Sequence, residues 1–208
     1  MTQVDNLLFG GAFDPPHLGH VSVVDQVLAS NICDQLWLMP VGTHPFDKDM
    51  APADHRLKML RLSFADLFKK WQARLALNTY ELDHPEIAYS YHTLKHFQSQ
   101  QPTKSLAWLI GSDNVVHFKK WRHSQELLEE FKVFVYPRAS HEVGPEGLPA
   151  GMELLKDVSL QSVSSRQIRQ RLQLGQSISD LVVPPVVDYI DHHLSSQYQV
   201  NKLANDHH

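Results

Sequence analysis

Residues 7–20, with the sequence LLFGGAFDPPHLGH, constrain the fold of this chain more than any other stretch. The apolar run at its start predicts a buried strand, and Gly10 and Gly11 after it predict a turn with close backbone approach and unusual φ angles. Two consecutive prolines then restrict the backbone, so that a helix cannot begin before His17. The stretch therefore predicts a strand, a glycine-containing turn and a helix, in that order.

This arrangement directs backbone N–H groups and the positive end of a helix toward an anion above the strand end. His17 and His20 are three residues apart, so both imidazoles can face that anion from the first helical turn. Each part alone has a plainer interpretation, because a glycine pair often forms only a turn and two such histidines are often solvated or form a chance metal pair. We expect the two histidines to matter for rate far more than for stability, because they lie on a polar turn.

The order of the first elements predicts a parallel sheet. Residues 4–9 and 36–39 are predicted strands, and a predicted helix over residues 20–30 lies between them. Such a unit is joined by a right-handed crossover, and the ligand of such a sheet binds at the carboxyl ends of its strands. The first turn lies at that end of the sheet.

The remaining chain continues this alternation without an internal repeat or a long linker. We expect further strands at residues 73–82, 105–110, 131–136 and 154–163, helices at 53–67, 89–98, 115–130 (irregular), 164–174 and 184–194, and loops at 42–53 and 139–151. The sequence thus predicts one domain over residues 1–195. Residues 196–208 form a polar tail that we expect to be disordered.

Composition sets limits on the class of protein. The chain has 208 residues and a net charge of -4, which gives no global basic field for gripping long nucleic acid. The single cysteine, Cys33, excludes an intramolecular disulfide and a cysteine-based zinc site. Nothing resembles a secretory signal or a membrane span, so we expect a cytosolic protein. The 14 histidines show no metal-binding spacing, so no protein-bound metal is predicted.

A second informative stretch is VSSRQIRQRL, residues 163–172. Ser164 and Ser165 would offer hydroxyls at the start of a helix, with a capping box between Ser164 and Gln167, and Arg169 lies one turn later. Hydroxyls, free N–H groups and a guanidinium together can bind a phosphate. The alternative is an ordinary capped amphipathic helix whose arginines lie in solvent.

The string FDPPHLGH resembles the HxGH signature of the nucleotidyltransferase superfamily, and GGAFDPPHLGH looks most like its nicotinate or nicotinamide mononucleotide adenylyltransferase branch. Residues 163–172 resemble the second signature of that family, a Ser-rich helix start followed by Ile-Arg, with Arg166 where the family usually has Thr. Residues 88–94, 109–113 and 182–190 resemble its SYTxxTL, IIGxD and LVPxxVxxYI segments. The loop at residues 44–48 departs from the family's Pro-Pro-His-Lys.

The resemblance implies a Rossmann-like nucleotidyltransferase fold, α/β with a mainly parallel sheet and helices on both faces. It implies transfer of the adenylyl group of ATP to nicotinate mononucleotide, giving nicotinate adenine dinucleotide and pyrophosphate, with Mg²⁺ bound mainly by ATP oxygens and water. The implied partners are these small molecules, with neither nucleic acid nor membrane. The oligomeric state and the choice between nicotinate and nicotinamide acceptors stay open.

The resemblance also implies site residues, of which His17, His20 and Arg169 would be catalytic. The implied ATP-binding residues are Gly10, Gly11, Phe13, His17, His20, Gly111, Asp113, Arg138, Ser164 and Arg169, and the implied mononucleotide-binding residues are Ser90, Trp121, Lys48 and His44. Without the resemblance, Trp121 would be read as a packing residue and Asp113 as a turn residue or helix cap. Two other functions stay open, namely transfer to another acceptor such as pantetheine phosphate or from a cytidylyl donor, and nucleotide binding without catalysis.

Overall fold

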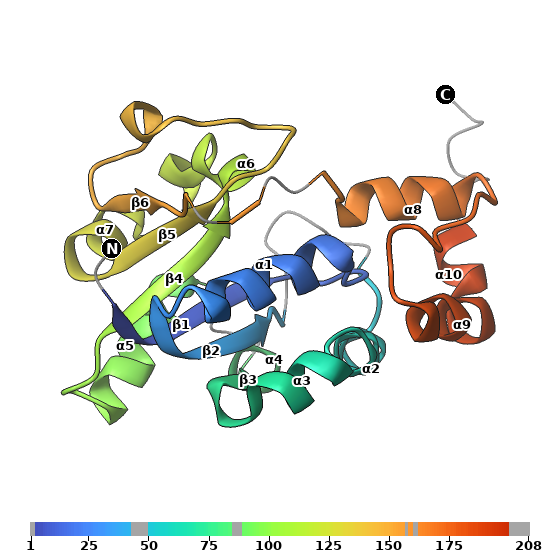
Figure 1. Ribbon diagram of the computed structural model, residues 1–208, viewed down its shortest axis with the longest axis horizontal. Helices are drawn as coiled ribbons and strands as arrows, with labels where there is room; N and C mark the ends of the chain where they lie inside the picture. The colour runs from blue at the N-terminus through green and yellow to red at the C-terminus, as the bar shows by residue number, and fades with distance from the viewer. Residues whose placement is uncertain (1–2, 43–49, 85–88, 157, 160–161, 200–208) are drawn as a thin grey trace.

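The computed structural model describes residues 3–42, 50–84, 89–156, 158–159 and 162–199, and its centre is a six-stranded sheet (Figure 1). The strands lie in the order β3-β2-β1-β4-β5-β6, and every neighbouring pair is parallel. Their bounds are Val4–Gly11 (β1), Cys33–Pro40 (β2), Leu75–Leu77 (β3), Leu106–Gly111 (β4), Lys132–Tyr136 (β5) and Met152–Leu154 (β6). The predicted Rossmann-like α/β fold with a parallel sheet is confirmed.

Strand β1 occupies the position that decides where a ligand can bind. It pairs with β2 on one side and with β4 on the other, so the direction in which the chain adds strands reverses beside it. Ligands of open parallel sheets bind at this switch point, at the carboxyl ends of the strands. The end of β1 at Gly11 therefore lies next to the end of β4 at Gly111, as the predicted site requires.

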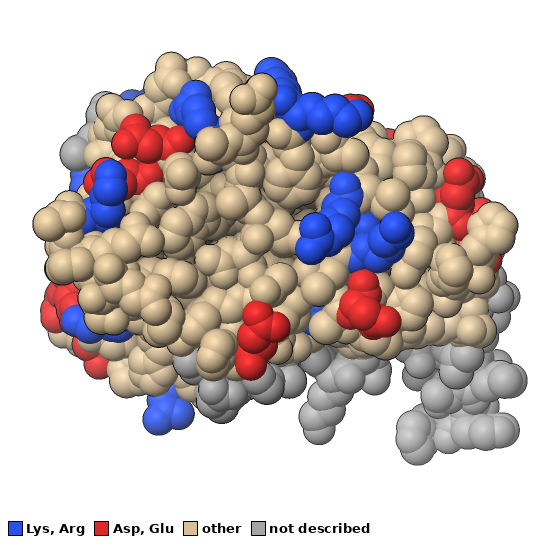
Figure 2. Space-filling view, turned by 90° about the horizontal axis from the view of Figure 1, so that it is seen from below, with Lys and Arg blue, Asp and Glu red and all other residues tan. Residues whose placement is uncertain are grey.

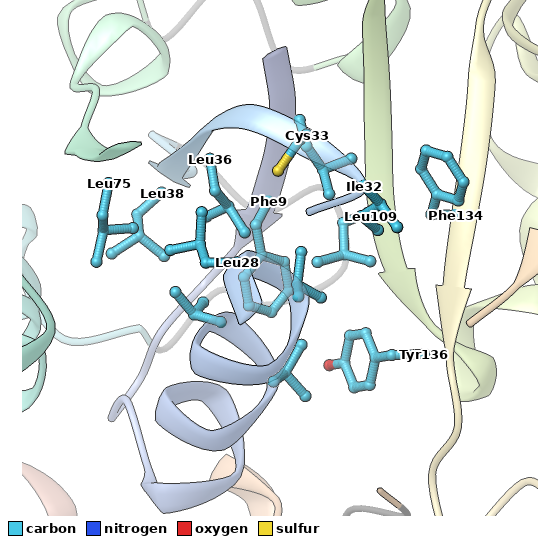
Figure 3. Close-up of a cluster of buried hydrophobic side chains, with 14 of the residues drawn as sticks. Phe9, Leu28, Ile32, Cys33, Leu36, Leu38, Leu75, Leu109, Phe134 and Tyr136 are labelled. Atoms are coloured by element: carbon cyan, nitrogen blue, oxygen red, sulfur yellow. The ribbon is translucent and has the colours of Figure 1, made fainter. Parts of the chain in front are cut away.

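Both faces of the sheet are buried, which explains the nearly continuous apolar runs of its central strands. Leu7 and Phe9 of β1 belong to a core cluster shared with helix α1, and Leu8 belongs to the cluster on the opposite face. Figure 3 shows Phe9 in the first cluster, between side chains of β2 such as Leu36 and side chains of β4 and β5 such as Tyr136. The alternation of side chains along a strand places these neighbours on opposite faces.

Helices cover both faces, as predicted. Helices α1 and α3 pack on the face of the first cluster, and α5 and α7 pack on the other. The helices are Leu18–Ala29 (α1), Ala53–Ser63 (α2), Ala65–Trp71 (α3), Tyr80–Asp83 (α4), Ser90–Gln100 (α5), Ser112–Val115 (α6), Ser124–Glu130 (α7), Ser165–Gln173 (α8), Pro184–His193 (α9) and Ser195–Gln199 (α10), with 3-10 turns at Gln72–Arg74 (η1), Phe118–Lys120 (η2) and Pro145–Gly147 (η3).

Two predicted helices are broken. The helix expected at residues 53–67 changes direction at Phe64, whose ring is fully buried and whose backbone leaves the helical region. The irregular helical stretch expected at residues 115–130 consists of the end of α6, the 3-10 turn η2 and helix α7. His123 adopts a left-handed backbone with φ of 59°, which interrupts any continuous helix there.

Two predicted strands are much shorter than expected. The strand over residues 73–82 is only β3, because the side chain of Asn78 accepts a hydrogen bond from the N–H of Tyr80 and a helical turn begins. The prediction of a strand over residues 154–163 is wrong for most of that range, because β6 ends at Leu154. Leu155 still donates its backbone N–H to the carbonyl of Val135 in β5 at 2.8 Å. The side chains of Leu155 and Val158 join the buried cluster that includes α1.

The C-terminal helices form a third apolar cluster, which includes Ile168 of α8, Ile190 of α9 and Met59 of α2. In Figure 1 these helices lie beyond one end of the sheet. The predicted start of a disordered tail at residue 196 is wrong. Ser195–Gln199 form α10, and Tyr198 in this helix is only 5% exposed. Residues 200–208 lie outside the described part of the chain.

None of the helices described is both long and apolar enough to cross a membrane. On the face drawn in Figure 2, basic side chains occur in small separate groups, most of them with acidic side chains nearby. The described part of that face therefore carries no continuous basic band. This distribution agrees with the small negative net charge of the sequence.

Candidate functional site

The first turn of α1 is capped by two histidines. His17 is the N-cap residue, and its Nδ1 accepts a hydrogen bond from the backbone N–H of His20 at 3.3 Å. The Nδ1 of His20 accepts in return from the backbone N–H of His17, also at 3.3 Å. The two rings are stacked, with their centroids 3.6 Å apart. The predicted proximity of these imidazoles is therefore present, in the form of a reciprocal capping box.

This capping geometry fixes the chemical form of both rings. A backbone N–H can only donate, so each Nδ1 must be an acceptor, and a neutral imidazole then carries its proton on Nε2. Burial lowers the pKa of His17 to about 3, and the nearby charge of Arg138 contributes to the shift. Burial also lowers the pKa of His20 well below its usual range, assisted by His17 and Arg138. We infer that both rings are neutral Nε2–H donors near pH 7.

The capping roles correct one expectation about these histidines. His17 is only 2% exposed, and the ring of His20 packs edge-on against Phe9 and Phe13. Removing either ring therefore also removes a cap hydrogen bond, which typically costs about 1 kcal/mol. Truncation at these positions is expected to affect stability as well as rate.

The two glycines before the turn serve packing and not an unusual backbone. Both lie within β1, and neither has a positive φ angle, so the predicted glycine turn was wrong. A Cβ on Gly10 would lie 2.3 Å from the ring of Trp108, and one on Gly11 would lie 3.3 Å from the ring of Phe13. The residue with a left-handed backbone is Phe13, with φ of 49°, and its buried ring packs edge-on against the ring of His20, with the centroids 5.0 Å apart.

The segments after β4 and β5 bring a guanidinium, that of Arg138, close to this turn. Arg138 is 7% exposed, and its Nη2 donates to the carbonyl of Val163 at 2.9 Å. Its Nε lies 3.4 Å from Oδ2 of Asp113. A Cβ on Gly111 would lie 2.4 Å from Oδ1 of Asp113 and 2.7 Å from Cδ of Arg138, so both side chains would have to shift. The possible role of Asp113 as a helix cap is wrong, since α6 is preceded by Gly111 and has no side-chain cap.

Helix α8 approaches the same turn from the other side. Ser164 caps the helix by accepting from the N–H of Gln167, which confirms one half of the predicted capping box. Arg169 donates from Nη1 to the carbonyl of Asp14 at 2.7 Å, and Ser165 donates to the carbonyl of Pro15 at 2.9 Å. The predicted alternative, a helix with all its arginines in solvent, is wrong for Arg169, which is half-buried. Arg166 is exposed.

Two of the predicted mononucleotide residues, Ser90 and Trp121, lie on α5 and next to η2. Ser90 is the first residue of α5, and no side chain in the described ranges caps that helix start. Trp121 is half-buried against Phe118, with ring centroids 5.2 Å apart, so it does pack against the core. Arg122 lies over the ring of Tyr89, the residue before α5, at 5.1 Å. His44 and Lys48 lie outside the described residues.

Sequence reasoning missed Arg56, which holds the loops around the site. Its side chain is fully buried and donates to the carbonyls of Ala51, Ala12 and Val41, each at 2.9 Å. These carbonyls follow β1 and β2 and precede α2, so one guanidinium joins three segments at the carboxyl end of the sheet. An arginine on an amphipathic helix is normally assigned to the solvent face, and no local pattern marks this one as buried.

Sequence reasoning also missed Glu81 of α4. Its carboxyl group is buried and accepts a hydrogen bond from the hydroxyl of Thr93 in α5 at 2.7 Å. Burial raises the pKa of Glu81 to about 7, although the Thr93 hydrogen bond favours the charged form. This contact joins α4 to the helix that begins at Ser90.

The assembled site is suited to binding an anion with several oxygens. It combines two neutral imidazole donors, the guanidinium groups of Arg138 and Arg169, and the amino ends of α1 and α8. Carboxylates are present too, but Asp14 and Asp113 lie beside the two arginines. Guanidinium groups and helix amino ends both favour phosphate oxygens. Such a site can bind a phosphate chain and neutralise charge that develops on it.

Comparison with known proteins assigns the family. A family model described as Cytidylyltransferase-like matches residues 8–171. A curated protein of Streptococcus pneumoniae serotype 4, named "Probable nicotinate-nucleotide adenylyltransferase", is 33% identical over 186 residues, which cover 88% of this chain and 85% of that protein. The chain belongs to the nicotinate-nucleotide adenylyltransferase family. The resemblance stated from the sequence motifs is confirmed.

A second curated relative and a solved structure are also similar to this chain. A Bacteroides fragilis protein of the same name is 28% identical over 188 residues, covering 89% of this chain and 90% of that protein. The structure described as Plasmodium falciparum nicotinic acid mononucleotide adenylyltransferase complexed with NaAD superposes with a TM-score of 0.81. It is 22% identical and covers 93% of this chain and 98% of its own, so this likeness supports the fold.

We predict that His17 and His20 of this family member stay neutral in the free protein between pH 8 and pH 5. Nitrogen NMR of ring-labelled histidine should show two Nε2–H tautomers without titration, assigned by comparison with His17→Gln and His20→Gln. In the unfolded chain these rings take up protons near the ordinary pKa of 6.5. The free energy of unfolding should therefore decrease as the pH falls below that value. Titration of either ring near pH 6.5 in the folded protein would contradict this assignment.

We predict that Glu81→Gln raises the melting temperature at pH 8 by several degrees and leaves it unchanged at pH 4.5. The folded-state pKa of about 7 exceeds the ordinary value of 4.5, so the wild type loses stability as the pH rises between these values. The amide of Gln resembles the protonated carboxyl group. It does not ionise, so the variant keeps its stability as the pH rises. Thermal unfolding at both pH values tests this, with Glu129→Gln on the exposed face of α7 as control. An equal effect at both pH values would show that Glu81 does not titrate as inferred.

Proposed function

We propose that this chain transfers the adenylyl group of ATP to nicotinate mononucleotide, forming nicotinate adenine dinucleotide and pyrophosphate as a step of NAD biosynthesis. The observation that carries the proposal is the convergence of His17, His20, Arg138 and Arg169 at the switch point of the sheet. Curated relatives that cover most of this chain carry the name of this activity. The Plasmodium falciparum enzyme, whose structure complexed with NaAD has the same fold, supports the same assignment.

The reaction needs positioning and charge neutralisation more than proton transfer. A phosphate oxygen of the mononucleotide attacks the α-phosphorus of ATP, and the bond from that phosphorus to the bridging oxygen of pyrophosphate breaks. The nucleophile is already anionic, so no general base has to activate it. Catalysis then depends on holding the two phosphates in line and on stabilising the charge that grows on the leaving group.

The described residues can divide that work. The Nε2–H groups of His17 and His20 would donate to the triphosphate without adding a positive charge of their own. Ser164, at the start of α8, and Arg169, one turn later, would meet the departing pyrophosphate. Arg138 would contact a further phosphate oxygen. The backbone at Gly111 and the carboxylate of Asp113 would lie toward the ribose or adenine.

The divalent metal is proposed to arrive with ATP. The described residues contain no group of three or more His, Cys, Asp or Glu side chains that could hold a metal ion. Mg²⁺ prefers octahedral oxygen ligands and is commonly held by substrate phosphates and water with few protein ligands. The site as described fits a metal carried by the nucleotide, which would share the neutralisation of the phosphates.

A pyrophosphate-release assay with a panel of donors and acceptors tests the proposal. We expect turnover with ATP and nicotinate mononucleotide in the presence of Mg²⁺, and little with CTP or with pantetheine phosphate. Turnover with another pair would assign a different transferase within the same superfamily. Nucleotide binding without turnover of any acceptor would show that this protein is a non-catalytic relative of these transferases.

We predict that Arg169→Lys lowers kcat about tenfold or more at saturating acceptor. A planar guanidinium can bind two phosphate oxygens while bonded to the Asp14 carbonyl, whereas an ammonium is a point charge. Tenfold corresponds to about 1.4 kcal/mol of transition-state stabilisation. Arg171→Lys is the matched control on the same helix, because Arg171 pairs with Asp180 at 2.6 Å. Equal kinetics for Arg169→Lys and the control would remove Arg169 from the proposed mechanism.

We predict a preference for nicotinate over nicotinamide mononucleotide of about tenfold or more in kcat/KM. The two acceptors have nearly the same shape, but a carboxylate only accepts hydrogen bonds while an amide must also place two N–H groups. The start of α5, which no side chain of the described residues caps, offers N–H groups and a positive dipole, and Arg122 adds a cation beside it.

The role of Arg122 in this preference can be separated from its packing. Arg122→Gln should reduce the ratio of the two specificity constants. Arg74→Gln is the control, because Arg74 lies over Trp71 in a similar way, at 5.3 Å, and donates to the carbonyl of Cys33 at the amino end of β2. Equal specificity constants for the two acceptors in the wild type would remove the argument from the helix start.

A further inference from the structure

A buried hydrogen bond joins the last described helix to the turn that carries the histidines. The hydroxyl of Tyr198 in α10 donates to Oδ1 of Asp14 at 2.6 Å. Asp14 is 1% exposed and Tyr198 is 5% exposed, so water does not compete freely for this contact. Asp14 is three residues before His17, within the same turn. The contact therefore connects α10 to the turn after β1 inside the candidate site.

Asp14 is the point where several parts of the site meet. Its Oδ2 accepts from the backbone N–H of Ala51 at 3.3 Å and lies 4.0 Å from Nη1 of Arg169. Its carbonyl accepts from Arg169 at 2.7 Å. The side chain of Asp14 thus contacts α10 and Ala51, two residues before α2, while its backbone carbonyl and its charge face Arg169 of α8.

Tyr198 is held firmly enough to position this carboxylate. Its ring belongs to the apolar cluster of α2, α8 and α9, which includes Ile168 and Met59. Burial and the negative charge of Asp14 raise the pKa of the Tyr198 hydroxyl, so the hydroxyl stays protonated and remains a donor. A ring fixed by packing and a hydroxyl fixed as a donor together define one place for Oδ1 of Asp14.

We propose that α10 contributes a positioning residue, Tyr198, to the site. Tyr198 acts through Asp14 and so holds the His17 turn and Arg169 in place. The hydrogen bond from Tyr198 satisfies a buried carboxylate oxygen that would otherwise have to find another donor. Arg169 forms an ion pair with that carboxylate, with its Nη1 4.0 Å from Oδ2. Loss of the hydroxyl would let Asp14 and Arg169 shift toward each other and would displace both from the phosphate-binding arrangement.

This inference rests on the proposed adenylyl transfer, and its test separates the two. The variant is Tyr198→Phe, which removes the hydroxyl and keeps the ring. The matched control is Tyr189→Phe in α9, where the hydroxyl contacts Nδ1 of His55 at 2.8 Å in the same group of helices. Both variants are compared with the wild type by kcat, by KM for ATP and for the acceptor, and by melting temperature.

We expect Tyr198→Phe to lower kcat by about tenfold, to raise KM for ATP, and to change KM for the acceptor by less than about threefold. Tyr189→Phe should retain wild-type kinetics. A merely structural tyrosine would lower the melting temperature without this division between ATP and acceptor, and that result would overturn the inference. A wild type without transferase activity would instead overturn the proposed function.

A double variant tests whether the effect passes through Asp14. If Tyr198 acts through that carboxylate, Asp14→Asn with Tyr198→Phe should be no slower than Asp14→Asn alone, within about threefold. If the double variant were slower than Asp14→Asn by the full factor seen for Tyr198→Phe in the wild type, the two residues would act independently. That result would contradict the proposal.

A spectroscopic measurement covers the case in which Tyr198→Phe does not fold. Fluorotyrosine placed at position 198 of the full chain should change its fluorine chemical shift when a non-hydrolysable ATP analogue binds. The same label at position 189 should not. An unchanged signal at position 198 on saturation with the analogue would overturn the proposal.

Discussion

The reciprocal capping of α1 by His17 and His20 is the interaction on which the site depends. Each ring uses Nδ1 to accept from the backbone of the other residue, which assigns the remaining proton to Nε2. Burial and the charge of Arg138 keep both rings neutral. The same contacts that begin the helix thus prepare two donors for an anion, and stability and function are coupled at this turn.

The sheet supplies the reason why distant segments meet there. Because β1 lies between β2 and β4, the turn after β1 adjoins the end of β4 and the Arg138 segment after β5. Arg56 joins the loops after β1 and β2 from within, and α8 joins the turn through Ser165 and Arg169. Most of these contacts end on backbone carbonyls, so they depend on the path of the chain more than on the identity of the residue that accepts.

The features that could be predicted from the sequence are those that depend on local residue patterns and on the family motifs. Apolar runs and the strand–helix–strand order gave the parallel sheet, and the spacing of His17 and His20 indicated that both rings face one site. The purpose of Gly10 could not be predicted, because Trp108, which fills the space beside it, belongs to another strand. The burial of Arg56 and Tyr198 was likewise missed, because a buried polar side chain is acceptable only where distant partners satisfy it, and here those partners come from other segments.

The most direct test of this account is the single-turnover rate of adenylyl transfer by His20→Ala, measured with saturating ATP and nicotinate mononucleotide. Circular dichroism at the assay temperature establishes that the variant is folded. The account predicts a fall of about 10²-fold or more, because one preorganised donor to the developing charge is lost, together with a lower melting temperature because the cap is lost. A folded His20→Ala protein that turns over at the wild-type rate would contradict it.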